Sequence, residues 1–143
     1  MSLPGELARS TNSILLKNTA RNTGEIAYLR EKALSAFLEK LQKREGKNLL
    51  KVMLFGSVAL GDSRPDSDID VFVLVNNGTN MELTERIVEI SVDADLEEGE
   101  CKVHIAPFIN TLEEYRDSRA FGVPVFYNID EEGVILYDNV AVM

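Results

Sequence analysis

Hydrophobic positions follow two different rhythms along this chain, and the change falls near Gly46. Before Gly46, apolar residues recur at steps of three and four, which predicts an amphipathic helix over residues 23–45. Asn22 and Glu25 have the spacing of a capping box at its start, and basic residues precede Gly46 at its end. The apolar stripe consists of Ile26, Leu29, Ala33, Phe37 and Leu41. Residues 4–20 are less periodic, and we expect a shorter helix there that packs on the helix at residues 23–45 or on another chain.

After Gly46 the pattern changes to short apolar runs rich in β-branched residues, which are typical of buried strands. The predicted elements are strands at 49–55 and 68–75, a helix at 80–96, a strand at 101–109, helices at 111–120 and from Pro124, and a strand at 134–137. This order predicts an α+β or α/β fold with a small mixed sheet flanked by helices. We divide the chain into an N-terminal helical extension, residues 1–46, and a domain of residues 47–143.

Composition and charge exclude several classes of protein. The 143 residues include 15 Lys and Arg against 24 Asp and Glu, a formal net charge of −9, so we expect no large nucleic-acid surface. The longest apolar run, residues 71–75, is far shorter than the roughly 20 residues of a membrane-spanning helix. No secretory signal is evident, and we expect a cytoplasmic protein. One Cys and one His cannot form a Cys/His zinc cluster.

The candidate chemistry lies between the first two predicted strands. Gly56 and Ser57 follow the first strand; glycine lets the backbone approach a phosphate, and the following amides and the Ser57 hydroxyl can donate to it. Asp68 and Asp70 open the second strand and share one face, with Cα atoms about 6.6 Å apart. Either one carboxyl is protonated or a cation lies between them. Hard oxygen ligands select Mg²⁺ or Mn²⁺, which bridge to the phosphates of a nucleoside triphosphate.

Each half of this pattern also has a structural reading. A Gly-Ser pair is often only a turn, and Asp-x-Asp is often a solvated edge or a helix cap. Together, at a separation of ten residues, they arise by chance in roughly one chain in several hundred of this length. Arg64, in the loop between the two halves, could also reach a phosphate oxygen.

The segment resembles the motif of the minimal nucleotidyltransferases of the DNA polymerase β-like superfamily: strand, Gly-Ser, ten residues, Asp-x-Asp, strand. Gly61, the Ser-Asp-Ile-Asp run at 67–70 and the stretch from Pro124 to Tyr137 extend the match, which covers about residues 48–138. The resemblance implies a polymerase β palm-like fold. It also implies Mg²⁺-dependent transfer of a nucleoside monophosphate from an NTP, with ATP expected, to a hydroxyl or phosphate acceptor. The implied nucleotide-binding residues are Gly56, Ser57, Arg64 and Ser67, and the implied metal ligands are Asp68 and Asp70.

Members of the family with full activity carry a third acidic residue on a neighbouring strand, and here His104 occupies the expected place. A neutral imidazole can accept a proton, but it is a poor Mg²⁺ ligand beside carboxylates. Glu100 has the same parity and could substitute. Two functions therefore stay open: catalysis by Asp68, Asp70 and His104, or a catalytically impaired module that binds nucleotide or neutralises a partner.

The resemblance also implies a protein partner. Minimal nucleotidyltransferases often occur as the antitoxin paired with a helical HEPN ribonuclease, and some attach AMP to it. An acidic chain suits a basic partner, and the N-terminal helices could instead form a homo-oligomer.

A few residues outside the motif have structural readings only. We expect Asp95 to face water from its helix and Cys101 to be buried at the start of its strand. Four aromatic residues recur near helical spacing, and we expect them in the core rather than in a platform for base stacking: Tyr115, Phe121, Phe126 and Tyr127.

Overall fold

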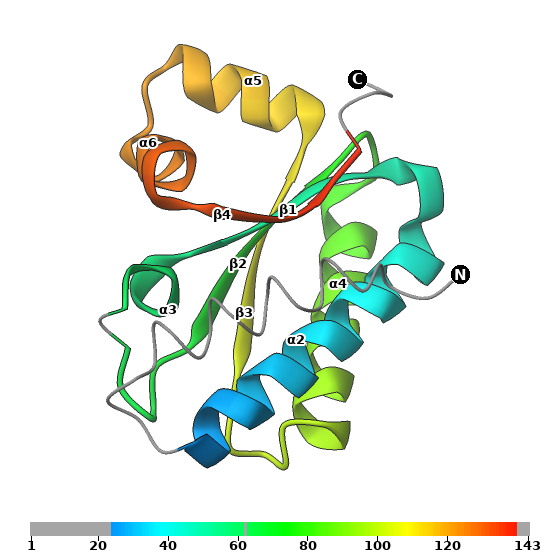
Figure 1. The fold of residues 1–143 in the computed structure, drawn as a ribbon. Helices are drawn as coiled ribbons and strands as arrows, with labels where there is room; N and C mark the ends of the chain where they lie inside the picture. The colour runs from blue at the N-terminus through cyan, green and yellow to red at the C-terminus, as the bar shows by residue number, and fades with distance from the viewer. Residues whose placement is uncertain (1–23, 62, 140–143) are drawn as a thin grey trace.

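The apolar stripe predicted for residues 23–45 forms helix α2, Gly24–Glu45 (Figure 1). The structure is a computed structural model that describes residues 24–61 and 63–139. The shorter helix expected at residues 4–20 lies outside the described residues. The stripe of α2 is buried because it packs on the sheet and on helix α4, Asn80–Glu97. Helix α2 thus shares its core with the sheet, and the domain boundary near residue 46 stays a prediction.

Four strands form one mixed sheet in the order β3-β2-β1-β4. The strands are β1 Leu49–Phe55, β2 Ile69–Val75, β3 Ile105–Thr111 and β4 Val134–Asp138. β1 runs antiparallel to β2 and β4, whereas β2 and β3 are parallel. Parallel neighbours need a crossover connection, and α4 provides it. The predicted fold class, a small mixed sheet flanked by helices, is confirmed.

Helices cover both faces of the sheet (Figure 1). α2 and α4 lie on one face, and two shorter helices, α5 (Leu112–Ala120) and α6 (Pro124–Glu132), lie on the other. β2 serves both layers, with Ile69, Val71, Val73 and Val75 in the core under α2 and α4, and Phe72 and Leu74 in the core under α6. A strand buried on both faces reads as a continuous apolar run, and this explains why β2 was recognisable in the sequence.

β3 begins at Ile105 rather than at Cys101, where the sequence predicted it. Glu100 and Cys101 have φ angles of 52° and 60°, in the left-handed region, which interrupts an extended strand. A Cβ on Gly99 would lie 2.7 Å from the carbonyl oxygen of Asp95, so the chain turns tightly against the end of α4. Cys101 is consequently exposed, and the expectation that it is buried was wrong.

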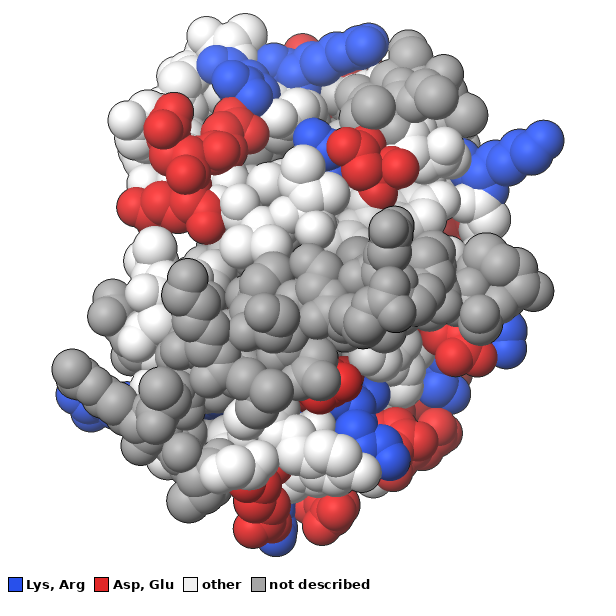
Figure 2. All heavy atoms as spheres, in the orientation of Figure 1, with Lys and Arg blue, Asp and Glu red and all other residues white. Residues whose placement is uncertain are grey.

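Charged side chains of both signs cover the described surface. Figure 2 shows Asp and Glu in clusters interspersed with Lys and Arg, and no extended basic patch among the described residues of the face it draws. Lys32 and Lys40 of α2 form ion pairs of 3.4 Å and 3.1 Å with Glu98 and Glu97 at the end of α4. Such exposed pairs add little to stability. None of the helices in the described ranges is long and apolar enough to cross a membrane.

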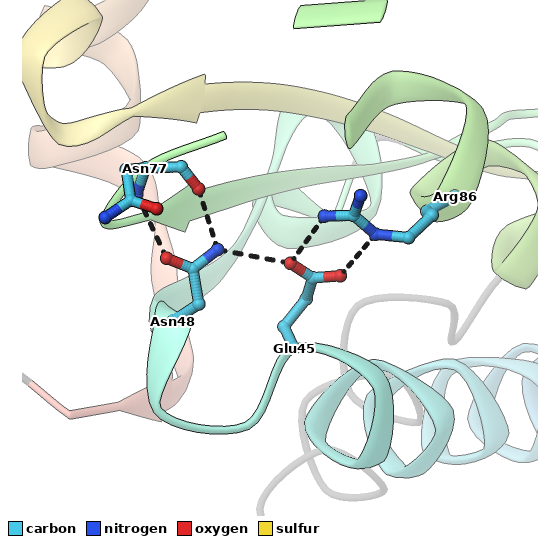
Figure 3. Close-up of polar contacts among 4 residues, drawn as sticks. All are labelled: Glu45, Asn48, Asn77 and Arg86. Carbon is cyan, nitrogen blue, oxygen red and sulfur yellow. Dashed lines mark hydrogen bonds and ion pairs between the residues drawn. The ribbon is translucent and has the colours of Figure 1, made fainter. Parts of the chain in front are cut away.

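A polar cluster closes the end of the sheet where β1 begins and β2 ends (Figure 3). Glu45, the last residue of α2, accepts hydrogen bonds from Nε and Nη2 of Arg86 at 2.9 Å and 3.0 Å. Asn48 donates to Glu45 at 3.2 Å and to the carbonyl oxygen of Asn77 at 2.8 Å, and its Oδ1 accepts from the N–H of Asn77 at 3.0 Å. The side chain of Glu45 is only 2% exposed. These four residues, called the Glu45 cluster below, tie α2 to α4 and to the loop after β2.

Candidate active site

The candidate site lies at the opposite end of β1 and β2 from the Glu45 cluster. β1 passes directly into the short helix α3, Gly56–Leu60. Gly56 has a φ of +75°, which L side chains rarely adopt, and a Cβ there would overlap Oδ2 of Asp70 and lie 3.0 Å from its Cγ. The register explains this closeness, because Phe55 pairs with Asp70. The glycine turn and one of the two predicted metal ligands are therefore in contact.

A tight turn leads from α3 to the two aspartates. α3 ends at Leu60, and the next residue, Gly61, has a φ of 82° in the left-handed region. The N–H of Ser67 donates to the carbonyl oxygen of Arg64 at 2.9 Å, and the N–H of Arg64 donates to Oγ of Ser67 at 2.8 Å. The Ser67 hydroxyl thus accepts a hydrogen bond inside the turn, and the residue Arg64 is exposed. The nucleotide contacts of Arg64 and Ser67 stay predictions.

Asp68 and Asp70 stand on either side of the first residue of β2. Asp68 is exposed and Asp70 is half-buried. Burial raises the pKa of Asp70 above its ordinary 3.8, and the charge of Asp68 raises it further. Two repelling carboxylates beside a glycine turn form a donor set that fits Mg²⁺ or Mn²⁺. No group of three or more His, Cys, Asp or Glu residues suited to a metal occurs in residues 24–61 and 63–139. Mg²⁺ in proteins usually keeps several waters and is bound through one or two carboxylates together with substrate phosphates.

Ala106 lies beside Asp70 on the neighbouring strand, since the two are register partners and paired residues of parallel strands share a face. His104, which the sequence placed at the third acidic position, lies one residue before β3. Its carbonyl oxygen accepts the N–H of Ile69 at 2.8 Å. Its Nδ1 lies 3.2 Å from Oδ2 of Asp95, on α4. The structure thus brings His104 to Asp95, and its catalytic role stays a prediction.

We expected Asp95 to face water, and this was wrong, because the residue is only 6% exposed. Its Oδ1 and Oδ2 accept from the N–H of Ile105 at 3.1 Å and 3.3 Å. Burial raises the pKa of Asp95; the hydrogen bond from Ile105 and the contact with His104 oppose this rise, and the charge of Asp68 adds to it. The available signal was its spacing of eight from Ile87, because positions eight apart lie on one face of a helix.

Arg30 is a second residue that the sequence analysis did not select. It is 0% exposed within the apolar stripe of α2, three residues before Ala33. Its guanidinium donates to Oγ of Ser63 and to the carbonyl oxygens of Arg64 and Ser67, all in the loop before β2. The signal was a basic residue at an apolar position of the helical pattern, because such a side chain must find polar partners inside the protein.

We expected Phe121 and Tyr127 in the core, and this was wrong, because they are 85% and 67% exposed. Phe126 occupies the buried position of α6 and packs on Phe72, which turns its neighbour Tyr127 outward. A cavity of about 640 Å³ lies between α5 and α6 and is bordered by Phe126 and Tyr127. None of the predicted site residues lines this cavity, and we assign it no part in the candidate site.

The chain belongs to the nucleotidyltransferase domain family, whose family model matches residues 34–130. The matched segment runs from within α2 to within α6 and includes Gly56, Asp68 and Asp70. The resemblance inferred from the motif is thereby confirmed at the level of the family. A comparison with curated proteins found no significant match.

Solved structures with a similar fold include two toxin–antitoxin complexes. One, a complex with AMP-PNP, is 18% identical, with a TM-score of 0.48 and coverage of 74% of this chain and 74% of that chain. The other, a mutant form of the MntA–HpeT toxin–antitoxin, is 16% identical, with a TM-score of 0.47 and coverage of 73% of each chain. A candidate nucleotidyltransferase from Sulfolobus solfataricus is 18% identical, with a TM-score of 0.39 and coverage of 94% and 90%.

Proposed function

We propose that this protein is a Mg²⁺- or Mn²⁺-dependent nucleotidyltransferase that transfers a nucleoside monophosphate from an NTP, with ATP expected, to a hydroxyl or phosphate acceptor. The observation that carries the proposal is the contact between the backbone of Gly56 and the carboxylate of Asp70. This contact places a backbone turn suited to binding phosphate directly beside a side chain suited to binding a divalent ion. Membership of the nucleotidyltransferase family supports the same assignment.

The chain's own residues bind and orient the triphosphate in this proposal. The amides after Gly56 and the hydroxyl of Ser57 donate to phosphate oxygens, and Arg64 adds a positive charge from the loop. Asp68 and Asp70 hold the ion through their carboxylate oxygens. A bound divalent ion would neutralise phosphate charge and stabilise the leaving pyrophosphate.

The transfer also needs a proton acceptor when the substrate is a hydroxyl. The acceptor oxygen forms a bond to the α-phosphorus, the bond from that phosphorus to the bridging oxygen of pyrophosphate breaks, and the hydroxyl releases its proton. We propose that His104 takes this proton. In the neutral tautomer with its proton on Nδ1, facing Asp95, the lone pair is on Nε2.

Calorimetric titration with ATP, GTP, CTP and UTP, each in Mg²⁺ and in EDTA, tests the proposal. We expect Mg²⁺-dependent binding of at least one nucleotide, and we expect Asp68→Asn and Asp70→Asn to weaken it. Asp66→Asn is the matched control, because Asp66 is an exposed acid of the same loop outside the pair. Absence of binding by all four nucleotides, or binding that neither variant of the pair changes, would overturn the proposal.

A second function, neutralisation of a partner without turnover, is favoured by His104, which takes the expected place of the third carboxylate, and by Ala106, the uncharged register partner of Asp70. The protein would then bind nucleotide and act as the antitoxin of a HEPN-type ribonuclease, and its net charge of −9 would suit a basic partner surface. Incubation with labelled ATP and cell extract separates the two functions. Label transferred to one small protein supports catalysis, whereas co-purification of an unlabelled protein supports binding alone.

A further inference from the structure

Arg30 connects α2 to the loop that carries the two aspartates. Its Nη1 donates to Oγ of Ser63 at 3.1 Å. Its Nη2 donates to the carbonyl oxygen of Arg64 at 2.5 Å and, at a longer 3.4 Å, to that of Ser67. Arg64 and Ser67 are the two ends of the tight turn before Asp68. One guanidinium on the helix therefore spans the whole turn.

The surroundings of Arg30 are unfavourable for a charge. The residue is 0% exposed, its Nε has no hydrogen-bond partner, and burial lowers its pKa. No carboxylate of residues 24–61 and 63–139 lies within ion-pair distance of it. Arg86 differs, since its guanidinium pairs with Glu45. Among the described residues, the partners of this buried cation are neutral oxygens of one loop, and burial of a charge against neutral partners contributes little to stability.

The turn that Arg30 holds leads directly to the predicted metal ligands. Asp68 follows Ser67, whose carbonyl oxygen accepts from Arg30. It precedes Ile69, whose N–H donates to the carbonyl oxygen of His104 at 2.8 Å. The backbone is thus tethered on both sides of Asp68, although Asp68 itself is exposed. Asp70 is held separately by β2, so Arg30 acts on the one ligand that lies outside the strand.

We propose that Arg30 is a positioning residue for the metal site, holding the turn of residues 64–67 so that Asp68 and Asp70 can bind the same ion. The inference rests on the proposed function and adds a residue to it. Arg30 lies before the segment matched by the family model, residues 34–130, and outside the Gly-Ser and Asp-x-Asp motif. A neutral apolar residue at position 30 would suit the stripe of α2, but it would leave the turn without its donor.

The test compares Arg30→Met and Arg30→Lys with Arg86→Met as the matched control. Nucleotide binding is measured calorimetrically in Mg²⁺ and in EDTA, at a temperature where circular dichroism shows each variant folded. We expect Arg30→Met to weaken Mg²⁺-dependent binding about 10- to 100-fold and to leave binding in EDTA unchanged. Arg30→Lys should fall between Arg30→Met and the wild type, because an ammonium keeps the charge without the fork that spans the turn. Arg86→Met should lower Tm and leave the affinity unchanged, since the Glu45 cluster lies the length of β1 away, about 20 Å.

The outcomes distinguish this inference from the proposed function. Absence of Mg²⁺-dependent binding in the wild type, or binding that neither Asp68→Asn nor Asp70→Asn changes, would refute both. Binding that Asp70→Asn weakens and Asp68→Asn does not would refute the role of Arg30 alone. Weak binding by Asp68→Asn together with wild-type affinity in Arg30→Met would refute the role of Arg30 alone. An equal loss in Mg²⁺ and in EDTA would also refute it, because Arg30 would then support the fold of the site and not the placement of the metal ligands. If Arg30→Met does not fold, Arg30→Lys decides, and wild-type affinity in that variant overturns the inference.

Discussion

Substitution of Gly56 by alanine tests the contact on which the candidate site depends. At a φ of +75° an added Cβ is disfavoured by about 1–2 kcal/mol, and the stiffer unfolded chain returns about 0.4–1 kcal/mol of this. The Cβ would also overlap Oδ2 of Asp70 and lie 3.0 Å from its Cγ, in a place where overpacking adds about 1–3 kcal/mol. We therefore expect Gly56→Ala to lower the free energy of unfolding by about 2–4 kcal/mol.

Two comparisons separate the backbone effect from the contact. Gly122 has a φ of +69° and no atom within 4 Å of an added Cβ, so Gly122→Ala should lower the free energy of unfolding by only about 1 kcal/mol. In an Asp70→Ala background the carboxylate is absent, and Gly56→Ala should lose about 1–3 kcal/mol of its effect. Urea unfolding followed by circular dichroism measures all four proteins of this cycle. If the two effects add to within about 0.5 kcal/mol, the Gly56 turn and the Asp70 carboxylate are not in contact and the reasoning is refuted.

Two further substitutions test the electrostatics at the two ends of the sheet. Asp70→Asn should raise Tm of the metal-free protein at pH 7. Burial and the charge of Asp68 raise the pKa of Asp70, so the folded state binds more protons than the unfolded state between pH 3.8 and the raised pKa. The stability of the wild type therefore falls as the pH rises through this range. The gain should disappear below pH 3.8, and a variant no more stable than the wild type at pH 7 contradicts this account. Arg86→Met should lower the free energy of unfolding by about 3 kcal/mol at pH 7, the low end for a broken buried pair, because the side chain of Arg86 is 30% exposed. Burial alone would raise the pKa of Glu45, but the hydrogen bonds from Arg86 and Asn48 outweigh this effect, so the pKa is lowered. The difference in stability between Arg86→Met and the wild type should therefore shrink as the pH falls from 4.5 through the lowered pKa. Urea titrations at several pH values measure this difference, and a difference that stays constant contradicts the account.

Local periodicity was sufficient to predict most of the fold. β1 has the predicted bounds, and α2 starts and ends within one residue of its predicted bounds. Both could be predicted because a buried strand and an amphipathic helix each have a characteristic spacing of apolar residues along the chain. The start of β3 was not predictable in this way. The segment before it has apolar residues at strand spacing, and only the left-handed backbone of Glu100 and Cys101 shows that it is a turn. Backbone conformation of that kind has no reliable signal in side-chain polarity, since both residues occur widely in strands and loops.

The candidate site likewise has one part that local sequence patterns predict and another that they do not. The closeness of Gly56 and Asp70 follows from a short segment, because β2 returns antiparallel to β1 and pairs Asp70 with Phe55. Arg30 meets its loop across a separation of more than thirty residues, and Asp95 meets His104 through the crossover from α4 to β3. These contacts depend on how helices are placed on the sheet, which periodicity does not specify. What the sequence does contain is the anomaly, an arginine within an apolar stripe.

Two arginines, Arg30 of α2 and Arg86 of α4, show why stability alone does not explain the candidate site. Arg86 has a carboxylate partner in Glu45, and the pair fastens two helices together. Arg30 has only neutral oxygen partners in the described chain, and the loop that it holds carries Asp68 beside Asp70, where the two carboxylates repel each other. Well-packed uncharged groups of similar size are often as stabilising as buried charges, or more so. A divalent ion would remove the repulsion between the aspartates, and Arg30 would keep them in place to receive it. In the proposed function, the repulsion between the two carboxylates would be relieved on binding of the ion, which is the energetic pattern of a preorganised ligand site.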